Sequence, residues 1–122
     1  VRTALDGMHG IVVPGGALVF DVCTETNSVR YFRDMTDRDQ GDGFRYIRRS
    51  SFEDGVQYNR FEIEFSDSEE TYLEEHRQRI YPLGDIQEAI DASPFNLLGA
   101  YDGFGFSPAS EKSDRVHFVL EA

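Results

Sequence analysis

The chain has 122 residues, of which 23 are acidic and 12 basic, so its formal net charge is −11 at pH 7. The acidic balance argues against nucleic-acid binding, which needs a basic stripe against the phosphates. No apolar run approaches the ~20 residues that span a bilayer, which argues against a membrane partner. A hydrophobic content of 39% predicts a folded chain with a single modest core. With Cys23 as the only cysteine, no internal disulfide is available, and we expect a cytoplasmic protein.

The first elements are a helical segment over residues 2–10 and an apolar strand over residues 17–23, introduced by a Pro-Gly-Gly turn. A continuous apolar run is typical of a parallel strand that helices cover on both faces. A parallel neighbour requires a crossover of a dozen or more residues, and only a dozen precede this strand. We therefore interpret the chain as the second part of a larger α/β domain.

The middle of the chain differs in kind. Residues 24–42 are polar and predict a loop, with a short helical turn around Val29, Tyr31 and Phe32. Segments 44–50, 56–66 and 70–81 then alternate in polarity, and Glu53-Asp54-Gly55 and Asp67-Ser68-Glu69 separate them. Asp-Gly is a strong hairpin signal. This pattern predicts a three-stranded antiparallel insert over 44–81, with Phe61, Ile63 and Phe65 on its apolar face.

The C-terminal part predicts a helix over 85–93, ended by Pro94, followed by strands 95–101 and 115–121. Taken as one domain, residues 1–122 would then combine core strands 17–23 and 95–121 with helix 85–93 and the insert. The expected fold class is α/β, which reduces to α+β in this fragment.

Several motifs in this order carry a resemblance to a known family. "VVPGGALVFDV", "EEHRQRIYPLGDI" and "NLLGAYDGFGFSP", followed by "SDRVHFVLEA", stand in sequence along the chain. Together they resemble the C-terminal half of class I S-adenosylmethionine-dependent methyltransferases, of the small-molecule type with an antiparallel insert. The resemblance covers essentially the whole chain. It implies an incomplete Rossmann-like methyltransferase sheet with the insert attached.

The resemblance implies the substrate-side portion of an enzyme that transfers a methyl group from S-adenosylmethionine to a small molecule. In such enzymes a Gly-rich loop and an acidic residue, each following a strand, hold the donor. The chain has no such motif, because no strand–helix unit surrounds the glycines of 103–107. We therefore expect the fragment alone to be inactive and to bind no cofactor. No Cys/His/carboxylate cluster suggests a metal.

His76 is the candidate catalytic base, because its unperturbed pKa lies near neutrality. Arg79 and Tyr81 match other fixed positions of the family motif, and Tyr58 lies on the polar face of the middle strand. Asp21 lies at the carboxyl end of its strand, where ligands bind in open α/β sheets. Each has a plainer alternative. His76 can pair with a neighbouring carboxylate, Asp21 can cap the next loop, and cross-strand pairing explains Arg60 opposite Glu74 or Glu75.

A second hypothesis makes the chain a non-enzymatic binding or oligomerisation module that recognises a partner through the antiparallel sheet. If the chain is the second part of a larger domain, strand 17–22 has lost its parallel neighbour and forms an open apolar edge. Such edges pair with other chains, so we expect a homodimer through 17–22.

Overall fold

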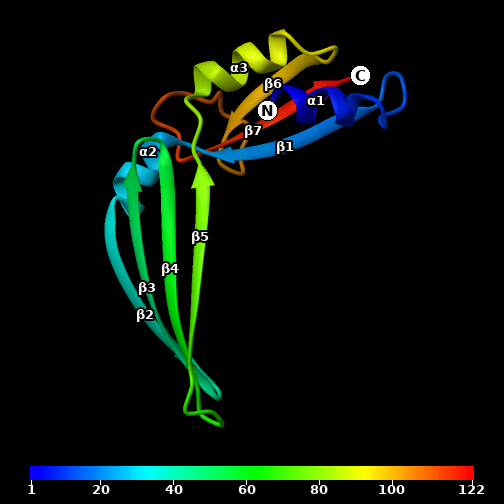
Figure 1. The fold of residues 1–122 in the computed structure, drawn as a ribbon. Helices are drawn as coiled ribbons and strands as arrows, with labels where there is room; N and C mark the ends of the chain where they lie inside the picture. Colours follow the sequence, from blue (N-terminus) through cyan, green and yellow to red (C-terminus); the bar gives the residue numbers. More distant parts are fainter. The chain divides into compact units, whose positions relative to one another are not determined.

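The computed structural model describes residues 1–122 and divides into two compact units (Figure 1). Unit 1 comprises Val1–Asn27 and Tyr81–Ala122, and unit 2 comprises Ser28–Ile80. Each unit contains one antiparallel sheet. None of the helices is long and apolar enough to cross a membrane.

The sheet of unit 1 has three strands in the order β1-β7-β6. Strand β1 (Ala17–Cys23) pairs along all seven residues with β7 (Arg115–Glu121), and β7 pairs in turn with β6 (Asn96–Asp102). Helices α1 (Arg2–His9) and α3 (Leu83–Asp91) and the short turn α2 (Glu25–Asn27) complete the unit. These elements confirm the expected α/β architecture.

The core of unit 1 lies between one face of this sheet and the two longer helices. Alternation along the strand points every second side chain of β7 toward the helices. These side chains pack against Leu5 of α1 and against Ile86 and Ile90 of α3. The buried members of β7 are Val116, Phe118 and Leu120. Fully burying each such side chain contributes roughly 1.5–3 kcal/mol, so this one face holds unit 1 together.

Strand β1 is the open edge that the sequence predicts, but helices do not cover both of its faces. It is an edge strand whose neighbour β7 runs antiparallel, and no parallel strand lies beside it. Helices cover one face alone, because Leu18, Phe20 and Val22 pack on the core while Val19 is 58% exposed. Strand β1 has apolar residues on both faces, but one face and one edge of the strand are open in this chain.

Unit 2 begins with a π-helical turn over Ser28–Phe32, which confirms the predicted short helical turn. Its sheet has four strands in the order β2-β3-β4-β5: β2 (Asp34–Gly41), β3 (Phe44–Glu53), β4 (Val56–Phe65) and β5 (Thr71–Arg79). The predicted insert of three strands over 44–81 was therefore one strand short. Strand β2 pairs with β3 through a two-residue turn at Asp42-Gly43, although its polar sequence predicted a loop.

Several boundaries also differ, and β5 ends at Arg79, so Tyr81, which the sequence places in strand 70–81, lies outside it. Helix α3 runs over 83–91 and not 85–93, because it begins directly after Pro82 and ends before Pro94 is reached. Strand β6 begins at Asn96, one residue later than predicted, and the preceding Phe95 is buried in the core.

The turn between β3 and β4 confirms the Asp-Gly signal. Glu53 pairs with Val56, so the loop is Asp54 and Gly55 alone, with φ of 51° and 72°. Positive φ at both positions is what a type I′ hairpin turn requires, and glycine adopts it without a Cβ clash.

We expect Gly55→Ala to lower the free energy of unfolding by about 1–2 kcal/mol, because it forces a Cβ into the left-handed region. Gly84→Ala is the matched control, since a Cβ at Gly84 meets nothing within 4 Å and alanine favours the helix. Urea unfolding of both variants measures the difference. Equal effects of the two substitutions would contradict the assigned turn.

Candidate functional site

The sheet of unit 2 has two chemically distinct faces. Alternation and register put Arg48, Asn59 and His76 on one face, which we call the aromatic face. Its rings and aliphatic side chains are Phe44, Tyr46, Phe61, Ile63, Phe65 and Tyr72. The opposite face, the charged face, carries Arg45, Tyr58, Arg60, Glu62, Glu75, Arg77 and Arg79. The predicted apolar face with Phe61, Ile63 and Phe65 is confirmed.

A polar cluster, largely buried, lies on the aromatic face. The Asn59 side-chain oxygen accepts hydrogen bonds from Arg48 Nε at 3.1 Å, Arg48 Nη2 at 2.7 Å and Ser50 Oγ at 2.7 Å. The guanidinium of Arg48 also lies over the rings of Phe32 and Phe61, at 4.9 and 5.6 Å from their centroids. Planar stacking and forked donation are the contacts for which arginine is suited. Arg48 is therefore held in one orientation.

The same row of β4 continues with Gln57. Its Oε1 accepts a hydrogen bond of 2.8 Å from the hydroxyl of Ser28, and both residues are buried. Gln57 and Asn59 are two residues apart and share the aromatic face. Buried amides of this kind need partners and fix local geometry when they have them.

His76 lies opposite Asn59 in the β4–β5 register. Its Nε2 lies 3.2 Å from Glu74 Oε2, and its ring meets Phe61 edge-on at 5.7 Å. The plainer alternative, pairing with a carboxylate, is thus present. The pair is also chemically useful, because an Nε2–H donated to Glu74 leaves Nδ1 as a proton acceptor. A groove lined by Phe44, Tyr46, Phe61, Ile63, Phe65, Glu74 and His76 runs along this face.

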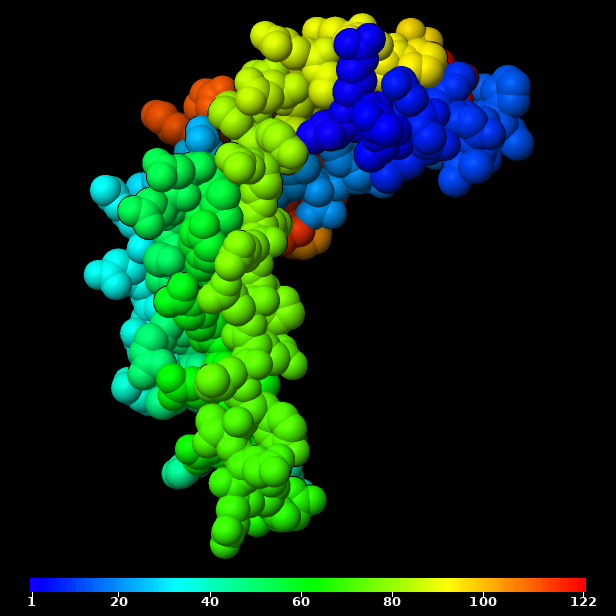
Figure 2. Space-filling view, viewed as in Figure 1, coloured from blue at the N-terminus to red at the C-terminus, as the bar shows by residue number.

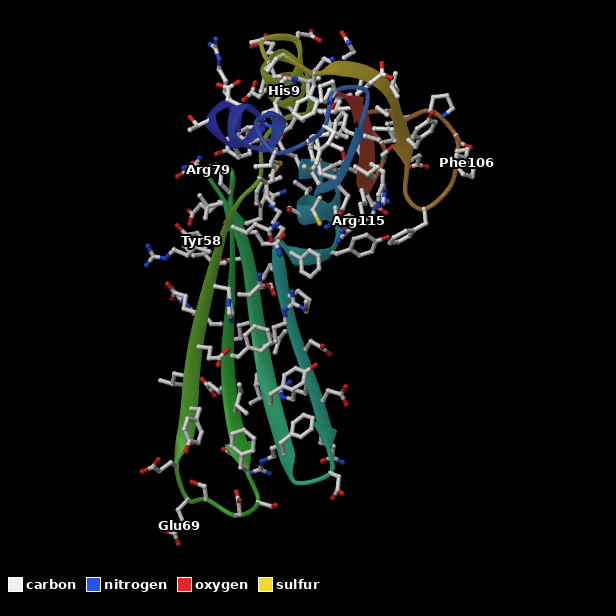
Figure 3. The ribbon with its side chains drawn as sticks, turned by 90° about the vertical axis from the view of Figure 1, so that its right-hand side faces the viewer. His9, Tyr58, Glu69, Arg79, Phe106 and Arg115 are labelled. Atoms are coloured by element: carbon white, nitrogen blue, oxygen red, sulfur yellow. The ribbon has the colours of Figure 1, made fainter.

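Tyr58 and Arg79, both labelled in Figure 3, lie on the charged face, away from His76. Arg77 stacks over the Tyr58 ring at 5.8 Å, and Arg79 Nη1 donates to the Asp54 carbonyl at 3.4 Å. The sheet therefore separates these residues from His76. The expected cross-strand pairing of Arg60 is confirmed, because Arg60 Nε donates to Glu75 at 2.7 Å.

Asp21 and Tyr81 belong to unit 1. Arg115 forms an ion pair with Asp21 and also donates to Cys23 Sγ at 3.3 Å. The cap of the following turn is Thr24, whose Oγ1 accepts the Asn27 amide at 3.1 Å. Asp21 is thus an ion-pair partner and not the cap. Tyr81 is 40% exposed.

A second histidine, in strand β7, has an unusual environment. His117 lies opposite Asp21 in the β1–β7 register, and its Nδ1 is buried without a hydrogen-bond partner. The exposed Phe104 ring covers it, with centroids 5.2 Å apart. His117 lies on the face of β7 opposite the core residues Val116 and Phe118, and no sequence pattern signals its contact with Phe104.

No protein-family model matches the sequence, and no curated protein resembles it at the sequence level. Solved structures do resemble the fold. An S-adenosylmethionine-dependent methyltransferase from Clostridium acetobutylicum matches 98% of this chain with a TM-score of 0.84 at 18% identity, and 50% of that protein is covered.

Two further similar structures are CalS10, an amino pentose methyltransferase from Micromonospora echinaspora solved with S-adenosylmethionine bound, and KedS8, a sugar N-methyltransferase from Streptoalloteichus. CalS10 gives a TM-score of 0.66 at 17% identity, with 98% of this chain and 49% of that chain covered. KedS8 gives 0.65 at 15%, with 99% and 49% covered. The chain therefore spans about half the length of these structures and has the fold of that half.

The hydrogen bond from Arg60, with a second from Arg77, holds the pKa of Glu75 below its ordinary value. Arg60→Ala should raise this pKa toward the ordinary glutamate value, as measured by NMR titration of the side-chain carboxyl. Arg45→Ala is the control and should leave the pKa of Glu75 unchanged, because Arg45 contacts Glu64.

The sign of the pH dependence follows from that lowered pKa. Stabilisation by the Glu75 carboxylate is fully present above the unfolded pKa of about 4.3 and is lost as pH falls through the lower folded value. Glu75→Gln should therefore destabilise the chain at neutral pH and have little effect in strong acid. A constant effect across this range would contradict the assignment.

Proposed function

We propose that the chain is the C-terminal, substrate-side portion of a cytoplasmic S-adenosylmethionine-dependent methyltransferase that acts on a small molecule. The observation that carries the proposal is the match of 98% of the chain, at a TM-score of 0.84, to half of such an enzyme. Two other similar structures are named as methyltransferases of sugars or amino sugars, which supports a small-molecule acceptor.

The residues present do not fit the methyl donor. Residues 103–107 connect β6 to a bend region that leads to β7, so no helix N-terminus follows the glycines. Phe104 and Phe106 of this loop are each 90% exposed, and the Phe106 ring (Figure 3) meets only the Tyr101 ring of β6 edge-on, with centroids 5.9 Å apart. In the proposed enzyme, the other half of the protein therefore binds the methyl donor. We assign no donor-binding residue in this chain.

The acceptor side is better supported. An amine or hydroxyl acceptor loses a proton when it is methylated, and His76 Nδ1 is available to take it while Glu74 holds Nε2. Phe61 and its neighbours offer apolar contact to a ring such as a sugar. We therefore propose His76 as the base. Tyr58, Arg79, Tyr81 and Asp21 stay predicted substrate contacts.

Isothermal titration of the 122-residue chain with S-adenosylmethionine should show no binding below millimolar concentration. A protein extended by the remaining half should bind it and release S-adenosylhomocysteine with one acceptor in a panel of amines, hydroxy compounds and amino sugars. His76→Gln in that protein should lower kcat by roughly 10²–10⁴-fold and leave donor affinity unchanged.

Arg38→Glu, on the distant β2 strand of the same sheet, is the control and should leave kcat unchanged. Sub-millimolar donor binding by the 122-residue chain would contradict the missing donor site. An unaltered kcat in His76→Gln would remove His76 from the proposal while leaving the fold assignment in place.

We also propose that the isolated chain forms a homodimer through the β1 edge at 17–22. Support comes from the open edge itself and from the exposed Val19. Val19→Lys should weaken this association, because a lysine on an edge strand opposes pairing. Hydrogen exchange of the β1 amides over a concentration series measures it. Protection that does not rise with concentration would contradict the β1 interface.

A further inference from the structure

Strand β5 is the open edge of the unit 2 sheet, and all nine of its residues are exposed. Figure 2 shows it, in yellow-green, running uncovered along unit 2. Leu73 is the extreme case at 74% exposure. A free strand edge presents unpaired backbone N–H and C=O groups, so it is a template for another strand.

Edge strands are usually guarded by proline, lysine or a β-bulge. Strand β5, with the sequence TYLEEHRQR, has neither residue, and its register with β4 is unbroken from Val56↔Arg79 to Glu64↔Thr71. The backbone of β5 therefore has no distortion that would prevent another strand from pairing with it. The charged side chains of β5 then determine which partner strand it can pair with.

The two edges of this sheet differ in charge pattern. Strand β2 carries Asp34, Asp37 and Asp39 against one arginine, so a second β2 would meet it with like charge. Strand β5 is acidic in its first half, at Glu74 and Glu75, and basic in its second half, at Arg77 and Arg79. An antiparallel copy of β5 reverses this order and sets acidic against basic residues.

We propose that β5 pairs antiparallel with β5 of a second copy, centred on His76. A two-fold axis perpendicular to the sheet keeps both aromatic faces on the same side. It also makes an isologous interface, in which each contact occurs twice. In this register Glu75 faces Arg77 of the partner subunit at both ends, and Glu74 faces Gln78 of the partner subunit. The two sheets become one continuous sheet.

Neighbouring registers are disfavoured by charge. Centring on Glu75 sets that carboxylate against its own copy, and centring on Arg77 does the same for the guanidinium. Like charges directly opposite destabilise a strand pair, while opposite charges stabilise it. The register centred on His76 avoids both conflicts. This interface does not depend on the proposed enzymatic activity.

The test uses complementary charge reversal in a Val19→Lys background, which suppresses association through β1. Glu75→Arg alone sets two guanidinium groups opposite each other at both ends of the interface, and Arg77→Glu alone sets two carboxylates opposite each other there. Each should raise the dimer dissociation constant at least about tenfold in sedimentation velocity. An equimolar mixture of the two variants pairs opposite charges again at both ends and should recover association as a heterodimer. The double variant that carries both substitutions restores opposite charges at both ends and should dimerise by itself.

The double variant and the mixture also control for folding, since a misfolded variant could not regain association when the charge is complemented. Arg38→Glu makes the same charge change as Arg77→Glu on the other edge and should leave the dimer unchanged. Hydrogen exchange should show protection of the β5 amides rising with concentration.

Three results would overturn the proposal: no dimer in the Val19→Lys background, a double variant that stays monomeric, or equal disruption by Arg38→Glu. Protection that rises over β1 and not over β5 would overturn it too and favour the β1 edge. Loss of donor binding or methyl transfer in an extended protein would bear on the proposed function and leave this interface intact.

Discussion

The pairing of β1 with β7 is the constraint on which unit 1 depends. The two strands join residues as far apart as Ala17 and Glu121, near the two ends of the chain. The loop-closure entropy of that contact is offset by burial of Val116, Phe118 and Leu120 beneath the two helices. Thr24 reinforces the junction, because its hydroxyl donates to the Ser113 carbonyl at 2.6 Å. The chain can therefore leave unit 1 after Asn27, build a second sheet and return at Tyr81.

Sequence patterns predicted the elements whose own residues determine them. Strand β7 has its predicted bounds, and Asp54-Gly55 fixed one hairpin. Strand β2 was missed because its polar residues show no alternation, and it forms by pairing with β3 across the Asp42-Gly43 turn. That turn carries the same Asp-Gly signal and was available from the sequence. The antiparallel neighbour of β1 was not, because the partner lies about a hundred residues away along the chain and no local pattern encodes it.

The site shows the same division. Period-two alternation puts His76 and Arg79 on opposite faces, since side-chain direction along a strand is a local property. The Arg48–Asn59–Ser50 cluster was not predicted, because it depends on the cross-strand register of β3 and β4. Residues that look like ordinary polar strand positions become a network shielded from water when register brings them together. A half-buried arginine and a buried amide are costly without partners, so this network constrains the register in return.

The net charge of −11 shapes how two copies of the chain can meet. Like net charges repel at long range, but salt screens that repulsion beyond about 8–10 Å, so contact depends on the charges near the interface. At the acidic β2 edge, repulsion between nearby carboxylates of two copies adds to the repulsion between their net charges. The basic second half of β5 instead attracts the acidic half of a second copy, and this attraction opposes the repulsion between the net charges. Within its own strand, Arg77 Nε already donates a hydrogen bond of 3.0 Å to Glu75. An apolar edge such as β1 has no charge order of this kind along Ala17–Cys23 to select a partner. Charge order along β5 specifies both partner and register, which distinguishes an edge that recognises its own copy from one that merely lacks a neighbour.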